Sequence, residues 1–123
     1  MPWLQWHLPS KTKIAGVTMS TPSTGGDLLR NVEVRVGNTK VDSEFRGRIS
    51  VNKLCGEFLG PGNNRRAYTI VCGSYIQADF ITVQILNSNA KLQINELELI
   101  TSFEGIKNFG YKYIIFPHFL SSG

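Results

Sequence analysis

At 123 residues, the chain has the length of one domain that can bury a core without metals or many cross-links. Its hydrophobic content of 41% and charged content of 18% exclude a wholly disordered protein. The formal charge is +4, but the basic residues are scattered and form no phosphate-binding stripe, so nucleic-acid binding is not expected.

The N-terminal segment predicts two short strands. Trp3 and Trp6 lie in the first, a polar turn follows over 9–13, and the second spans 14–19. We interpret both tryptophans as core packing. The alternative is a sugar-stacking platform, in which an aromatic face packs on the C–H side of a pyranose.

Alternation of apolar and polar residues predicts the central strands. A loop-forming stretch at 20–27 and a strong turn at 60–64 separate them. The segments with strand character are 29–37, 48–51, 55–58, 67–72 and 80–85. Because no window shows helical periodicity over three turns, these short strands predict an all-β, antiparallel sandwich or barrel.

The strand at 80–85 is followed by a run in which the alternation slips. Ile81, Val83 and Ile85 share one side and Thr82 and Gln84 the other, which predicts one buried face and one wet face. In the run at 92–99, the leucines and isoleucine change parity near Asn95 and Glu96. A β-bulge there would return both apolar pairs to the same core.

The residues after Ile100 differ in composition. Aromatic side chains crowd into 101–123 without clean alternation. We interpret this segment as a tail outside a domain formed by residues 1–100; the alternative is an aromatic edge strand at 111–116.

Two cysteines, Cys55 and Cys72, permit two interpretations. They could form a disulfide around a turn, worth about 3 kcal/mol, or remain buried thiols in a reducing compartment. Only His7 and His118 could join them as zinc ligands, and the spacing typical of zinc sites is absent.

Catalytic motifs and membrane segments are both absent from the sequence. There is no GxSxG, HExxH or phosphate-cradling glycine loop, so an enzyme is not expected. No run reaches the roughly 18 apolar residues of a membrane span. The N-terminus lacks the features of a signal peptide, and we expect the chain to be a fragment whose upstream part is missing.

The order and spacing of several segments resemble one known family. Over residues 2–100 the chain resembles the fucolectins (F-type lectins), part of the discoidin or coagulation factor 5/8 C-type group of galactose-binding-like domains. The segments that carry this resemblance are 2–8, 14–19, 29–37, Cys55-Gly56, Cys72, 80–85 and 94–99. It implies an eight-stranded jelly-roll sandwich, an extracellular or cell-surface location and a Cys55–Cys72 disulfide.

The resemblance also implies a glycan site, which this chain has altered. Fucose-binding members use an upstream histidine and an R-x-D-x(4)-R/K motif in the loop before the 29–37 strand, because arginines donate charge-assisted hydrogen bonds to sugar hydroxyls. The motif positions fall near Thr21, Ser23 and Leu28, and a shift of one or two residues would bring in Arg30. The candidate ligand-binding residues are therefore Thr21, Ser23, Asp27 and Arg30, in a degraded fucose site.

A calcium site is implied in the same way. Glu96 matches an acidic ligand of the family, and Asn95 replaces a cysteine that contributes its backbone carbonyl. Calcium takes six to eight oxygen ligands, and the others would come from the missing upstream segment.

Three functions remain as expectations. The first is a carbohydrate-binding module with an altered site, and the second is a structural or adhesion domain that contacts extracellular proteins. The third is binding of an acidic ligand by the scattered arginines, whose signature would be strong salt dependence. These arginines are Arg46, Arg48, Arg65 and Arg66.

Overall fold

The computed structural model describes residues 1–87, 89–104 and, as backbone, 112–115. The described chain is built from strands, which confirms the all-β prediction. A short 3₁₀ helix, η1 (Gly26–Leu28), lies in the loop after the first strand. The strands are β1 (Trp3–Ser20), β2 (Val32–Gly37), β3 (Lys53–Phe58), β4 (Ala67–Ile85), β5 (Glu96–Ile100) and β6 (Lys112–Ile115).

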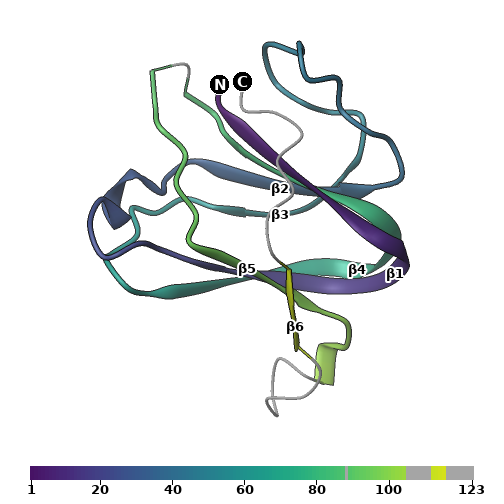
Figure 1. Cartoon of the computed structure of the whole chain (residues 1–123). Helices are drawn as coiled ribbons and strands as arrows, with labels where there is room; N and C mark the ends of the chain where they lie inside the picture. Colours follow the sequence, from purple (N-terminus) through teal and green to yellow (C-terminus); the bar gives the residue numbers. More distant parts are fainter. Residues whose placement is uncertain (88, 105–111, 116–123) are drawn as a thin grey trace.

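All strands join one antiparallel sheet in the order β3-β2-β4-β1-β5-β6. The long strands β1 and β4 pair along most of their length, and both curve round one side of the molecule (Figure 1). Their pairing shifts between His7 and Thr12 and between Ile14 and Gly16. The predicted turn at 9–13 is therefore wrong, because this polar segment continues a strand through the bend.

The bend brings the two halves of the sheet onto one core. In the first half, β2 pairs with the end of β4, where Val32 lies opposite Ile85. In the second half, β5 pairs with the end of β1, where Leu99 lies opposite Val17. Apolar side chains from both halves form one cluster, because alternate residues of each strand point inward. It includes Trp6, Val17, Met19, Val34, Ile81, Val83, Leu97 and Leu99.

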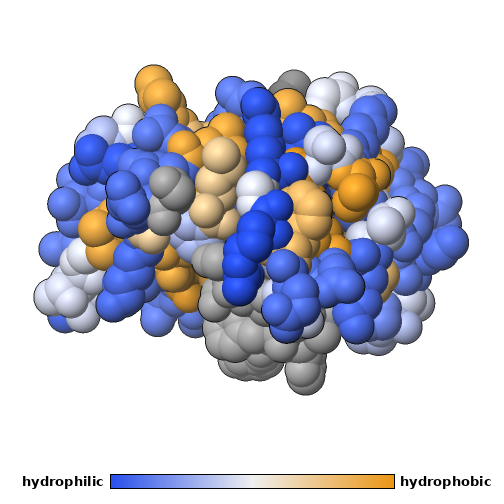
Figure 2. Space-filling model, turned by 90° about the horizontal axis from the view of Figure 1, so that it is seen from above, coloured by the Kyte–Doolittle hydropathy of each residue, from blue (hydrophilic) through white to orange (hydrophobic). Residues whose placement is uncertain are grey.

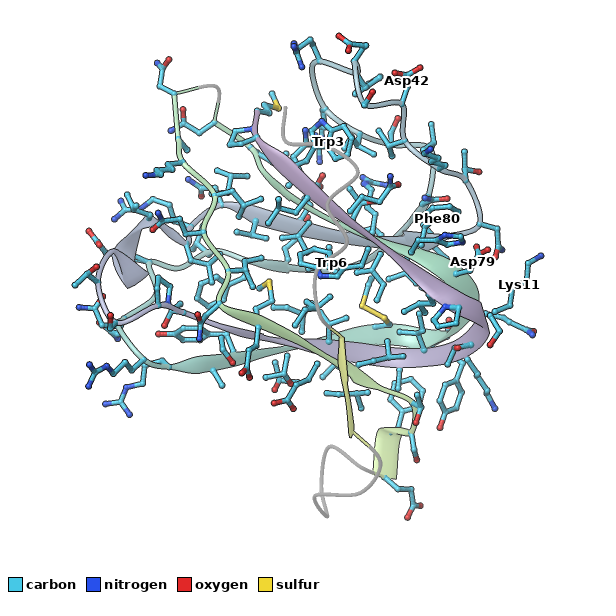
Figure 3. The ribbon with its side chains drawn as sticks, viewed as in Figure 1. Trp3, Trp6, Lys11, Asp42, Asp79 and Phe80 are labelled. Carbon is cyan, nitrogen blue, oxygen red and sulfur yellow. A yellow bond between two sulfur atoms is a disulfide. The ribbon has the colours of Figure 1, made fainter. Side chains whose placement is uncertain are left out.

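The opposite face of the first half is also buried, contrary to the expectation of a wet face. Thr82 and Gln84 are each only 2% exposed. The segment 38–52 crosses this face, and a second apolar cluster of Trp3, Val41 and Ile49 lies beneath it. Figure 3 shows Trp3 below the loop that carries Asp42, whereas Trp6 lies within the main core.

Two buried glutamines hold this covering segment, called here the 38–52 loop, to the sheet. The Gln5 Nε2 donates to the Val41 carbonyl, and its Oε1 accepts the Val41 N–H at 2.9 Å. The Gln84 Oε1 accepts the N–H of Ile49 at 2.8 Å, while its Nε2 donates to the carbonyl of Gly47. Buried amides need such partners, and here the loop backbone supplies them.

The predicted bulge near Asn95 and Glu96 is wrong. The residues before Glu96 are not in a strand, and β5 pairs with β1 without a register shift. Leu92 and Ile94 pack on the edge of the core as partly buried side chains of a loop. Their parity therefore does not have to match that of Leu97.

Part of the segment 101–123 joins the sheet. The backbone of β6 pairs with β5, with Tyr113 opposite Leu99. The remaining aromatic residues predicted for this tail, from 105 to 111 and from 116 to 123, lie outside the described residues.

A disulfide joins Cys55 of β3 to Cys72 of β4. Both residues are buried in the core. The bond links β3, at the edge of the first half of the sheet, to the second half of the sheet. The pairing implied by the family resemblance is present, and the alternative of two free thiols is not observed.

Candidate functional site

Two loops meet at the end of the molecule where β1 finishes and β4 begins. The Arg65 N–H donates to the Pro22 carbonyl at 3.0 Å, and the Thr21 N–H donates to the Arg66 carbonyl at 2.8 Å. Farther along, the Gly62 N–H donates to the Leu29 carbonyl at 2.9 Å. The turn at 60–66 is therefore bound to the loop that carries the predicted sugar-binding residues.

Thr21 joins the two loops through its side chain. Its hydroxyl shares its one hydrogen between the carbonyls of Asn63 and Arg66, and it accepts the Arg66 N–H at 2.9 Å. The residue is only 3% exposed. Thr21 therefore shapes the site but has no free hydroxyl to offer a ligand, which differs from its predicted role.

Gly26 allows the loops to approach each other closely. A Cβ at this position would lie 2.3 Å from the Asn63 carbonyl oxygen and 2.6 Å from the Asn64 nitrogen. The Gly26 N–H also donates to the Asn64 Oδ1 at 2.8 Å. Only glycine fits here without displacing the backbone of the 60–66 turn.

Substitution of Gly26→Ala is expected to lower the free energy of unfolding by about 1–3 kcal/mol, because the added methyl group must displace backbone rather than a flexible side chain. Chemical denaturation measures this change. Gly73→Ala is the matched control, since a Cβ there meets no atom within 4 Å. Equal stabilities of the two variants would contradict the described loop contact.

The loops line an open hollow of about 410 Å³ whose lining contains two arginines. Its lining is polar apart from one alanine and consists of Ser20, Thr21, Ser23, Arg65, Arg66, Ala67 and Asn95. We call it the arginine hollow. Ser23, Arg65, Arg66 and Asn95 are exposed, and no acidic residue lines the hollow. It can therefore offer guanidinium, hydroxyl and amide groups to a polar ligand.

A second hollow, of about 330 Å³, shares Asn95 with the first. Its lining is mainly apolar and consists of Leu4, Pro22, Leu92, Gln93, Ile94 and Asn95. We call it the apolar hollow. The shared residue places a hydrogen-bonding surface next to one that can pack on carbon atoms.

The structure separates the four predicted ligand-binding residues. Thr21 and Ser23 line the arginine hollow, whereas Asp27 and Arg30 do not. Asp27 lies in η1, and the Arg30 Nε donates to its carbonyl at 3.0 Å. Both residues are exposed to solvent. The adjacent basic pair Arg65 and Arg66 takes the place in the hollow that the motif comparison had given to Arg30.

The four scattered arginines do not form one surface. Arg48 binds Glu33 of β2 through two hydrogen bonds, one of them 3.2 Å from Nε to Oε1. Arg35 contributes a further ion pair at 3.6 Å. The hydrogen bond from Arg48 is the main reason that the pKa of Glu33 is held below its ordinary value, against the effect of burial. Arg48 thus has an acidic partner within the fold, and Arg46 is exposed on the 38–52 loop.

The predicted calcium ligands do not form a cluster in the described part of the chain. Asn95 and Glu96 are both exposed, and the Asn95 N–H donates to the Ser20 carbonyl at 2.8 Å. No group of three or more His, Cys, Asp or Glu side chains there could hold a metal ion. Two oxygen-bearing side chains fall short of the ligand number that calcium requires.

Neither tryptophan can form the alternative sugar-stacking platform. Trp3 is 0% and Trp6 1% exposed, so their ring faces are occupied by the protein. The interpretation of both as core residues is correct.

Comparison with protein-family models, curated protein sequences and solved structures finds no match to this chain. Among the described residues there is no helix of the length and apolarity needed to cross a membrane.

Proposed function

We propose that this chain is an extracellular glycan-binding domain and that the arginine hollow is its binding site. The observation that carries the proposal is the meeting of Arg65 and Arg66 with Ser23 and Asn95 at one hollow. Guanidinium groups donate directional, charge-assisted hydrogen bonds, which is the chemistry that sugar oxygens require. The adjoining apolar hollow suits the C–H face of a pyranose.

The fold supports the same proposal. A sheet that bends along β1 and β4 and encloses one core is consistent with a jelly-roll sandwich of the fucolectin type. The Cys55–Cys72 disulfide is in keeping with an oxidising, extracellular environment. In this proposal the chain binds glycans at the same end as such a domain, but Arg65 and Arg66 of the 60–66 turn replace the arginines of the family motif. Asn95 and Glu96 would complete a calcium site only with ligands from another segment.

A glycan array, probed with and without calcium, tests the proposal. We expect binding to a defined set of glycans, weakened about tenfold or more in the double variant Arg65→Ala/Arg66→Ala, because two charged donors are lost. The control Lys11→Ala/Arg46→Ala removes the same charge from exposed positions outside the hollow. Figure 3 shows Lys11 projecting from the far side, where β1 bends.

A folded protein that binds no glycan on the array would contradict the proposal. So would equal loss of binding in the two double variants, because the effect would then follow net charge and not the hollow.

A further inference from the structure

We infer that the ligand of the arginine hollow is an acidic glycan, one that carries sulfate or carboxylate groups on its sugar rings. The inference rests on the proposed glycan-binding function and names the class of glycan.

The first argument is that Arg65 and Arg66 have no bonding partner in the described part of the chain. Three of the six arginine side chains have a partner within the described part of the fold: Arg30 bonds to Asp27, Arg35 to Asn52 and Arg48 to Glu33. The guanidinium groups of Arg65 and Arg66 form no hydrogen bond or ion pair with the described part of the chain, and both residues line one hollow. An anionic ligand at this hollow can therefore accept charge-assisted hydrogen bonds from both guanidinium groups.

The second argument is the balance of donors and acceptors. Each guanidinium has five N–H donors and no acceptor, and no carboxylate lines the hollow to accept from a neutral sugar hydroxyl. Fucose or galactose hydroxyls both donate and accept, and in this lining only uncharged hydroxyl and amide side-chain oxygens could accept from them. Sulfate and carboxylate oxygens only accept, and they carry the negative charge that complements the two guanidinium groups.

The third argument is that the backbone beneath the arginines is held in place. The Arg66 N–H and carbonyl both bond to Thr21, and the Arg65 N–H bonds to Pro22. Arg65 adopts φ = 52°, in the left-handed region that non-glycine residues rarely occupy. The surrounding contacts maintain this conformation, so the loop backbone that carries the two arginines is already ordered before a ligand binds.

The apolar hollow distinguishes an acidic glycan from a free anion. It shares Asn95 with the arginine hollow and presents Pro22, Leu92 and Ile94 beside the charged groups. A bare sulfate or phosphate ion would leave this surface unused, whereas a sugar ring that carries the anionic group can cover it.

The test compares a sulfated fucan oligosaccharide with the same oligosaccharide after chemical desulfation, using calorimetric titration of the full chain. We expect the sulfated form to bind about tenfold or more tightly and its affinity to fall as NaCl is raised, because exposed charges are screened by salt. Inorganic sulfate should compete only weakly, since it cannot occupy the apolar hollow.

Two double variants separate charge from shape. Arg65→Lys/Arg66→Lys keeps the positive charge and should keep most of the preference for the sulfated form. Arg65→Gln/Arg66→Gln keeps hydrogen-bond donors without the charge and should abolish the preference. The matched control Lys11→Gln/Arg46→Gln should behave as the unmodified chain does.

The outcomes divide clearly. Equal affinity for the sulfated and desulfated forms would overturn the inference and leave the proposed function standing. Absence of binding to both, together with silence on the glycan array, would overturn the two together. Equally tight binding of duplex DNA or of a phosphopeptide would show unselective attraction of polyanions and would overturn the glycan class.

Discussion

Replacement of Trp3 by alanine is expected to lower the free energy of unfolding by about 3–5 kcal/mol, the range for a large aromatic removed from a core. Trp3 is 0% exposed and forms the second apolar cluster with Val41 and Ile49. Its Nε1 also donates to the Phe45 carbonyl at 3.3 Å. Small domains are stable by about 5–15 kcal/mol, so the loss is a large part of the total.

The effect should be concentrated in the 38–52 loop. The loop contains trypsin sites at Lys40, Arg46 and Arg48, and release of its anchor should expose them to cleavage under native conditions. Chemical denaturation and timed trypsin digestion measure the two effects. Leu59→Ala is the control, because Leu59 is 78% exposed and should change stability by no more than about 0.5 kcal/mol. A Trp3→Ala protein with the stability and cleavage pattern of this control would show that the loop does not depend on Trp3.

Replacement of Glu33 by alanine is expected to cost about 3–4 kcal/mol, toward the lower end of the range for a broken buried ion pair. The Glu33 side chain is 2% exposed, while Arg35 and Arg48 are 15% and 55% exposed. Loss of the carboxylate leaves the mostly buried Arg35 with one hydrogen bond, to the Asn52 carbonyl. The exposure of Arg48 reduces the cost, because water can solvate its freed guanidinium.

The same residue predicts the response to acid. The hydrogen bond from Arg48 holds the pKa of Glu33 below its ordinary value of 4.5, so the unfolded chain binds this proton more readily than the folded chain. The stabilisation is therefore fully present above about pH 4.5 and is lost as the pH falls through the lower pKa of the folded state. Glu33→Gln should remove this part of the acid dependence.

Urea denaturation from pH 7 down to pH 3 measures the acid effect. Glu44→Gln is the matched control, because it removes an exposed carboxylate from the 38–52 loop and should leave the pH profile nearly unchanged. If the Glu33→Gln and Glu44→Gln profiles coincide, then the ion pair does not contribute to acid stability.

The position of the site was only partly predictable. Arg65 and Arg66 stand out in the sequence as an adjacent basic pair after a strong turn, and Ser23 lies in a predicted loop. Their meeting depends on the pairing of β4 with β1, in which Ala67 lies opposite Ser20. Residues separated by more than forty positions have no local pattern that reports such a pairing. The motif comparison therefore favoured Arg30, which lies nearby in sequence but outside the hollow.

The side of a strand that faces the core follows from the sequence alone. Val32, Val34 and Val36 alternate with polar residues, as do Ile81 and Val83, and all of them are buried. Side chains alternate across an extended chain, so the apolar set can reach only one face. The strand predicted at 55–58 is confirmed by β3.

What covers the other face was decided by the tertiary structure. Local alternation marks Glu33, Thr82 and Gln84 as polar, which predicts contact with water, yet each is only 2% exposed. Glu33 and Gln84 can be buried because the 38–52 loop supplies hydrogen-bond partners to both side chains. A polar side chain that bonds to water and one that bonds to a distant loop look the same in the sequence. The alternation of residue types shows which side chains are polar, but not which group they bond to. The same distinction separates Arg48, paired within the fold, from Arg65 and Arg66, which remain available to a ligand.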